Sequence, residues 1–146
     1  MDMLKTLSAT FLVITLSACS KNVSSMADRT AEPCADKPNC VSTQDTRPDH
    51  HLASYELVST DTNINAVEQA ALTLHNAKTA EKTQDYLRIE CTSSVFRFMD
   101  DLEIRINDGQ LLVRSESRTG HSDFGVNRER ADSLRLKLVD ANIIKP

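Results

Sequence analysis

Apolar and polar residues alternate along two runs of the chain, residues 86–92 and 102–115. Alternation with a period of two is typical of strands that bury one face against a core. Asp108 and Gly109 interrupt the second run, and both tolerate the positive φ angles of a two-residue hairpin turn. The pattern therefore predicts one strand followed by a hairpin.

A two-residue turn also fixes the register of this hairpin. Glu103 then opposes Arg114 on the polar face, which predicts an ion pair across the strands. In the earlier run, Cys91 falls in phase with Leu87 and Ile89, which predicts a buried thiol. On the core face the predicted pairs are Ile106 with Leu111, Ile104 with Val113 and Leu102 with Ser115.

Apolar spacings of three and four residues predict two helices. The first runs for three to four turns and frays by residues 78–82, and the second is C-terminal with Asn127 as its N-cap. Residues 54–58 predict a short strand, and residues 95–99 a strand or a bulged extension. The helical stripes are Ile64, Val67, Ala71 and Leu74, preceded by the candidate caps Asp61, Thr62, Asn63 and Asn65, and then Ala131, Leu134, Leu138 and Ala141.

The element order β-α-β-β-β-α predicts a single α+β domain over residues 34–146. We expect two layers, an antiparallel sheet of about four strands with both helices on one face. The length of 146 residues suits one domain, and an apolar content of 40% excludes disorder throughout. A net charge of −4 argues against a nucleic-acid partner, which calls for a basic surplus.

The N-terminus predicts export. Residues 7–18 form an apolar stretch that is too short to span a bilayer, as in a signal peptide. The stretch ends in Leu16-Ser17-Ala18-Cys19, which looks like a bacterial lipobox. We therefore expect a signal peptide over 1–18 and a lipid on Cys19, the alternative being an ordinary signal peptide cut after Ala18.

The residues after this cysteine extend the prediction to a location. Ser20 resembles the outer-membrane sorting choice, so we expect a protein anchored in the outer membrane that faces the periplasm. Residues 19–33 contain few apolar side chains that could offset the entropy of ordering, and they predict a flexible tether.

Three further cysteines leave at least one thiol unpaired in the monomer. Turn-forming residues between Cys34 and Cys40 favour a disulfide between these two. A bond from either of them to Cys91, or no disulfide, remains an alternative. A metal site with His50 and His51 is disfavoured by the ligand spacing, and we expect neither metal nor cofactor.

The segment from Val113 to Arg128 reads V-R-S-E-S-R-T-G-H-S-D-F-G-V-N-R and is dense in hydrogen-bonding side chains. It resembles the signature of the family called domain of unknown function 1499, and the resemblance extends to Cys34-x-x-x-Pro-Asn-Cys40 and to residues 96–103. His121 and Cys91 depart from the family pattern. The resemblance implies a small envelope or membrane-associated protein with no established reaction.

Three hypotheses fit this polar segment. Its arginines near a helix N-terminus suit a small anionic ligand or an envelope protein partner. Alternatively, Ser122, His121 and Asp123 catalyse hydrolysis or group transfer, although consecutive residues rarely point at one another. The third hypothesis is a purely structural network. For the binding hypothesis the candidate residues are Arg114, Ser117, Arg118, Ser122, Asp123, Asn127 and Arg128, with Arg130 nearby.

Overall fold

The structure is a computed structural model that describes residues 26–93 and 97–146. The predicted signal peptide, Cys19 and the first part of the predicted tether lie outside these residues. So do residues 95 and 96 of the predicted strand extension.

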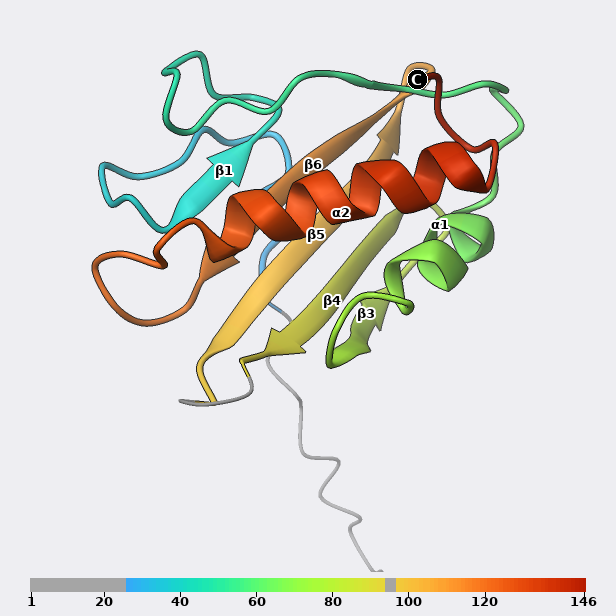
Figure 1. The fold of residues 1–146 in the computed structure, drawn as a ribbon. Helices are drawn as coiled ribbons and strands as arrows, with labels where there is room; N and C mark the ends of the chain where they lie inside the picture. Colours follow the sequence, from blue (N-terminus) through green and yellow to red (C-terminus); the bar gives the residue numbers. More distant parts are fainter. Residues whose placement is uncertain (1–25, 94–96) are drawn as a thin grey trace, which may run out of the picture.

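Six strands form one antiparallel sheet in the order β1-β6-β5-β4-β3, with β2 also beside β6 (Figure 1). The strands are β1 (Cys40–Ser42), β2 (Tyr55–Glu56), β3 (Ala77–Lys82), β4 (Tyr86–Thr92), β5 (Met99–Asn107) and β6 (Gln110–Ser117). The helices are α1 (Ile64–Ala71) and α2 (Val126–Asp140).

Both helices cover the same face of the sheet, so the domain has two layers (Figure 1). The core between the layers is apolar, with Leu87, Ile104 and Val113 from the sheet packed with Val67 and Leu134 from the helices. The predicted α+β class and the helices on one face are confirmed, but the sheet has six strands rather than about four.

The hairpin of β5 and β6 has the predicted register, with Ile104 opposite Val113 and Ile106 opposite Leu111. Glu103 lies opposite Arg114, also as predicted. Within the described residues no ion pair joins these two side chains, because each bonds to a different group on the same face. The predicted cross-strand ion pair is therefore wrong, although the register behind it is correct.

Residues 78–82, predicted to be a fraying helix end, belong to strand β3. Helix α1 has eight residues, about two turns instead of three to four, and it is capped by the side chain of Asn63, which accepts from the N–H of Asn65 at 2.8 Å. A positive φ of 49° at Asn76 then turns the chain into β3. Pairing with β4 overrides the weak helical propensity of this segment.

Only Met99 of the predicted extension 95–99 lies in a strand of the described chain. Arg97 has a φ of 53°, which ordinary strands do not adopt.

Helix α2 begins directly after a tight turn, and its N-cap is Gly125 with a φ of 86°. Asn127, predicted as the cap, is the second residue of the helix and is fully buried. The sequence pattern thus located the helix start to within two residues but assigned the wrong role to Asn127. The N–H of Asn127 is instead satisfied by the carboxylate of Asp123, at 2.8 Å.

Of the cysteine pairings left open by the sequence, the structure contains a disulfide between Cys34 and Cys40, with Cα atoms 5.8 Å apart. Cys91 is free and buried on the core face of β4. Burial raises the pKa of this thiol. Cys91 thus behaves as a small core residue.

The packed chain begins before Cys34. Thr30 is fully buried, and Arg29 donates to two carboxylates on the face of the sheet that the helices leave open. The second half of the segment that composition assigned to a flexible tether therefore belongs to the folded domain.

Candidate functional site

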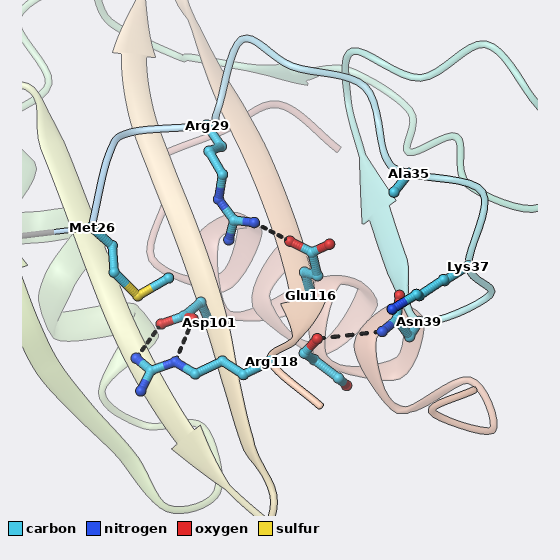
Figure 2. Close-up of a pocket in the computed structure, with 9 residues that line it drawn as sticks. Met26, Arg29, Ala35, Lys37, Asn39, Asp101, Glu116 and Arg118 are labelled. Carbon is cyan, nitrogen blue, oxygen red and sulfur yellow. Dashed lines mark hydrogen bonds and ion pairs between the residues drawn. The ribbon is translucent and has the colours of Figure 1, made fainter. Parts of the chain in front are cut away.

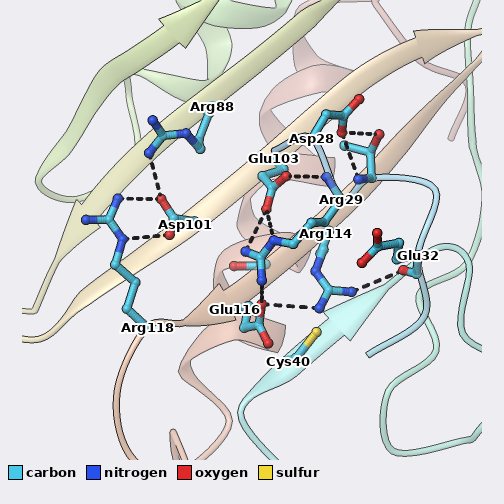
Figure 3. A network of polar contacts seen from close by, with 12 residues as sticks. Asp28, Arg29, Glu32, Cys40, Arg88, Asp101, Glu103, Arg114, Glu116 and Arg118 are labelled. Atoms are coloured by element: carbon cyan, nitrogen blue, oxygen red, sulfur yellow. Dashed lines mark hydrogen bonds and ion pairs between the residues drawn. The ribbon is translucent and has the colours of Figure 1, made fainter. Parts of the chain in front are cut away.

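The face of the sheet opposite the helices is polar, yet much of it is buried. The segment after Asp28 crosses this face and carries Arg29 over the middle of β5 and β6 (Figure 3). Charged groups that leave water must be paired, and this covering segment contributes part of the pairing. The buried side chains are Tyr86, Arg88, Asp101, Glu103 and Arg114.

Arg29 donates three hydrogen bonds to the buried carboxylate of Glu103, from its backbone N–H at 2.9 Å, from Nη2 at 2.8 Å and from Nε at 3.2 Å. Its other terminal nitrogen pairs with Glu116. The hydroxyl of Tyr86 donates to Glu103 at 3.2 Å, and burial together with the charge of Glu103 raises the pKa of Tyr86. These contacts hold the start of the domain on the sheet.

Arg118 forms a bidentate pair with Asp101, with Nε 2.7 Å from Oδ2 and Nη2 2.8 Å from Oδ1. Arg88 donates to the same carboxylate at 3.2 Å. Burial alone would raise the pKa of Asp101, but the hydrogen bonds and charges of Arg118 and Arg88 outweigh it and lower this pKa. The pair with Asp101 in turn raises the pKa of Arg118.

Other arginines of the polar segment are engaged as well. Arg114 donates to the carbonyl oxygen of Pro33 at 3.0 Å, and Arg128 donates to the carbonyl oxygen of His51 at 3.0 Å. Arg130 pairs with Asp100 at 2.5 Å. These guanidinium groups already have partners, so an anionic ligand would have to compete with them.

A pocket of about 360 Å³ lies on the open face between Arg29 and Arg118 (Figure 2). We call it the open-face pocket. Figure 2 shows the two guanidinium groups turned toward Glu116 and Asp101 rather than toward a common point. Neither guanidinium group is therefore unpaired, whereas an anion site requires unpaired cations that converge on one point.

A second polar system lies on the helix side of the sheet and centres on the buried Asn127. Its Nδ2 is 2.9 Å from the hydroxyl of Ser117 and 3.0 Å from the carbonyl oxygen of Asn39. Its Oδ1 accepts from Ser115 at 2.7 Å and from Arg130 at 2.6 Å. This amide therefore joins α2, β6 and the end of the disulfide loop.

The turn before α2 is tied to the same system. Asp123 accepts from the N–H groups of Gly125 at 3.0 Å and Asn127 at 2.8 Å, and the hydroxyl of Ser122 accepts from the N–H of Phe124 at 3.2 Å. Phe124 has a φ of 55° and is 95% exposed. A bulky residue in the left-handed region is strained, and such strain persists only where surrounding bonds enforce it.

Phe124 borders a pocket of about 280 Å³ at the end of β6, which we call the apolar pocket. Phe98 and Val126, which are 53% and 40% exposed, form other parts of its wall. Exposed large apolar side chains that gather beside a pocket are typical of interaction sites. The polar part of the wall also contains two carboxylates, of which Asp100 pairs with Arg130 and Asp123 accepts from the turn and from α2. The other polar residues of the wall are Ser93, Ser117, Thr119 and Ser122.

The candidate catalytic group is not assembled. Ser122 accepts from the N–H of Phe124, and both oxygens of Asp123 accept from the turn and from α2. Within the described residues no hydrogen bond joins His121 to either of them. A nucleophile, a base and an orienting group in mutual contact, as hydrolysis requires, are thus missing from this segment.

One cluster has the residue types of a metal site, since ligand atoms of Cys34, Asp45 and His50 lie within 4.8 Å of one another. The sulfur of Cys34 is in the disulfide, and Asp45 accepts from Arg47 and from the N–H of Cys34. The hydrogen bonds from Arg47 lower the pKa of Asp45. The cluster is a hydrogen-bonded support for the disulfide loop and does not fit a metal ion.

The structure thus divides the predicted binding residues among separate places. Ser117, Asp123 and Asn127 come together on the helix side, with Ser122 in the adjoining turn. Two of the remaining arginines, Arg114 and Arg118, lie on the open face, and Arg128 reaches the loop at residues 49–51.

The family model described as "Protein of unknown function (DUF1499)" matches residues 30–138. The chain belongs to this family. Comparison with curated proteins and with solved structures gave no match. The matched range includes Thr30 and the whole of the Asn127 system, in agreement with a domain that starts before Cys34.

Sequence reasoning missed Arg29 and Phe124. Arg29 lies in a segment whose composition resembles a linker, and only the buried acids that it covers reveal its role. The sequence does indicate the exposure of Phe124, because a bulky residue between the turn formers Asp123 and Gly125 is not placed to pack into the core.

Replacing Arg118 with Gln is expected to destabilise the domain by about 1–3 kcal/mol, because it removes a bidentate partner from a buried carboxylate. The melting temperature then falls by several degrees at pH 7. The pKa of Asp101 is lower in the folded state than in the unfolded chain, where it is near 3.9. The ionised carboxylate therefore stabilises the fold above this pH, and its contribution is lost as the pH falls below it. The difference in melting temperature between the wild type and the Arg118→Gln protein should therefore shrink as the pH falls from 7 to 3.

Lys145→Gln is the matched control, because it also removes one positive charge but breaks an exposed pair with Glu56. Its melting temperature should stay within about one degree of the wild type. An Arg118→Gln protein as stable as this control would show that Arg118 has no structural role.

Proposed function

We propose that the protein is a lipid-anchored binding protein of the bacterial cell envelope. Its N-terminal Cys19 carries the anchor, and its domain binds an apolar partner through the surface formed by Phe98, Phe124 and Val126. The proposal keeps the binding role expected from the polar segment but moves the contact from the arginines to the turn before α2.

The observation that carries this proposal is the geometry of Phe124. Ser122, Asp123 and Asn127 hold the turn in a conformation that exposes the phenyl ring almost completely. Exposing a Phe side chain forgoes about 1.5–3 kcal/mol of burial, and the left-handed backbone adds strain. The hydrogen bonds of the turn maintain this exposed ring and this strained backbone despite their cost. We infer from this that Phe124 is presented for contact with a partner.

The arginines support the same division of roles. Arg118 and Arg114 already bind carboxylate and carbonyl oxygens of the domain itself, so their first contribution is to the fold. A small anion would have to displace these groups. The binding of an anionic ligand is for this reason the weaker candidate.

The anchor rests on the sequence, and the described residues are compatible with it. Within residues 26–93 and 97–146, the structure has no helix that is long and apolar enough to cross a bilayer.

Substitution of Cys19 by Ala is expected to abolish acylation and to move the protein out of the membrane fraction. Mass spectrometry of the mature N-terminus and membrane fractionation measure the two effects. Ser20→Ala serves as the control and should keep the lipid. If the Cys19→Ala protein is processed and stays in the membrane fraction like the wild type, the anchor is refuted.

A photo-cross-linking amino acid at position 124 is expected to give an adduct in intact cell envelopes, because the ring faces the bound partner. The same group at Leu136, which is 67% exposed on α2, is the matched control and should give none. Intact-protein mass spectrometry detects adducts of lipid and of protein. Equal yields at the two positions would contradict the proposed binding surface.

A further inference from the structure

We propose that the occupant of this surface is the lipid bilayer to which the chain is anchored. The rings of Phe124 and Phe98, with Val126, enter the interfacial region of the membrane and fix the orientation of the domain. This inference rests on the proposed function, since it names the partner of the same surface.

The two aromatic side chains come from different segments but lie at one end of the molecule. Phe98 directly precedes β5 and Phe124 directly precedes the N-cap of α2, and both border the apolar pocket. The opposite end of the β5–β6 hairpin is the turn at Gly109, roughly 26 Å away along eight strand residues. Phe98, Phe124 and Val126 thus form a group at the end away from Gly109, whereas the other exposed large apolar residues, Val58, Leu72 and Leu136, do not border this pocket.

The anchored end of the chain leaves the domain at this same end. Met26, the first described residue, lies beside Arg118 in the open-face pocket (Figure 2). Ser117 borders both the open-face pocket and the apolar pocket. Six residues lie between Cys19 and Met26, and the seven Cα-to-Cα steps limit the distance to the anchor to about 25 Å. A lipid on Cys19 would therefore be attached nearer to the apolar end than to the hairpin turn.

The surrounding charges suit the boundary between headgroups and acyl chains. Arg97 and His121 are exposed and lie close in sequence to the two Phe residues. Lys37 precedes Pro38, whose carbonyl oxygen accepts from the N–H of Asp123. Two exposed acids, Asp36 and Glu129, also lie in this region. Apolar rings that enter the membrane beside basic side chains are the usual composition of an interfacial contact.

The chain contains no Trp, so a single introduced indole reports on one position. We would couple the chain from Cys19 to Pro146 through the Cys19 thiol to maleimide-bearing vesicles of phosphatidylethanolamine and phosphatidylglycerol. The other cysteines are in the disulfide or buried, so the coupling is selective. Attachment does not depend on acylation in the cell, which separates this test from that of the anchor.

In vesicles with brominated acyl chains, the fluorescence of Phe124→Trp is expected to shift to shorter wavelength and to be quenched. The matched control is Val58→Trp, whose fluorescence should not change. Val58 is a 47% exposed apolar position at the opposite end, next to Leu57, whose N–H donates to the carbonyl oxygen of Gly109. Without coupling, Phe124→Ser should weaken vesicle partitioning by about tenfold, whereas Leu136→Ser should not. Melting curves of the variants exclude unfolding as a cause.

Quenching of the Phe124→Trp protein that does not exceed that of the Val58→Trp protein would overturn the inference. If, in addition, the photo-adduct at position 124 in envelopes is a protein, the binding surface stands and its partner is a protein. If no adduct forms there, the proposed function fails independently of the vesicle result.

Discussion

The buried amide of Asn127 is the interaction on which the functional end of the domain depends. It lies on the first turn of α2 and bonds to groups of β6, of the disulfide loop and of the preceding turn. A buried amide without these partners would cost several kcal/mol. The helix, the strand and the loop therefore stabilise one another through this side chain. The exposed Phe124 is a consequence of this arrangement.

A second constraint acts on the other face of the sheet. Glu103 and Asp101 project from β5 into a region that the segment after Asp28 covers, and Arg29 and Arg118 neutralise them. Strand alternation alone would leave these acids in water. Because Arg29 supplies charge from a segment close to the predicted anchor, the pairing of charges and the attachment of the chain to the sheet are coupled.

The parts of the fold that local patterns encode could be predicted. Alternation and the Asp108-Gly109 turn specify the β5–β6 register, and periodicity locates both helices. Strand β3 could not, because its mixed residues become a strand only through pairing with β4. The polar segment was recognised as a unit, but Arg114 and Arg118 point to the face opposite Asn127. Which partner each side chain meets depends on contacts between segments far apart in the sequence, such as Arg29 with Glu103.

This end of the domain rests on one interaction, in which the Asn127 amide holds the turn that presents Phe124. Hydrogen exchange of the backbone N–H groups of Gly125 and Asn127 tests it most directly, in the wild type and in an Asn127→Ala protein. We expect faster exchange at Gly125 and at residue 127 in the variant, together with a loss of stability of about 2–4 kcal/mol. Leu136→Ala, on the exposed side of α2, should change neither. An Asn127→Ala protein with wild-type protection in this turn would contradict the account.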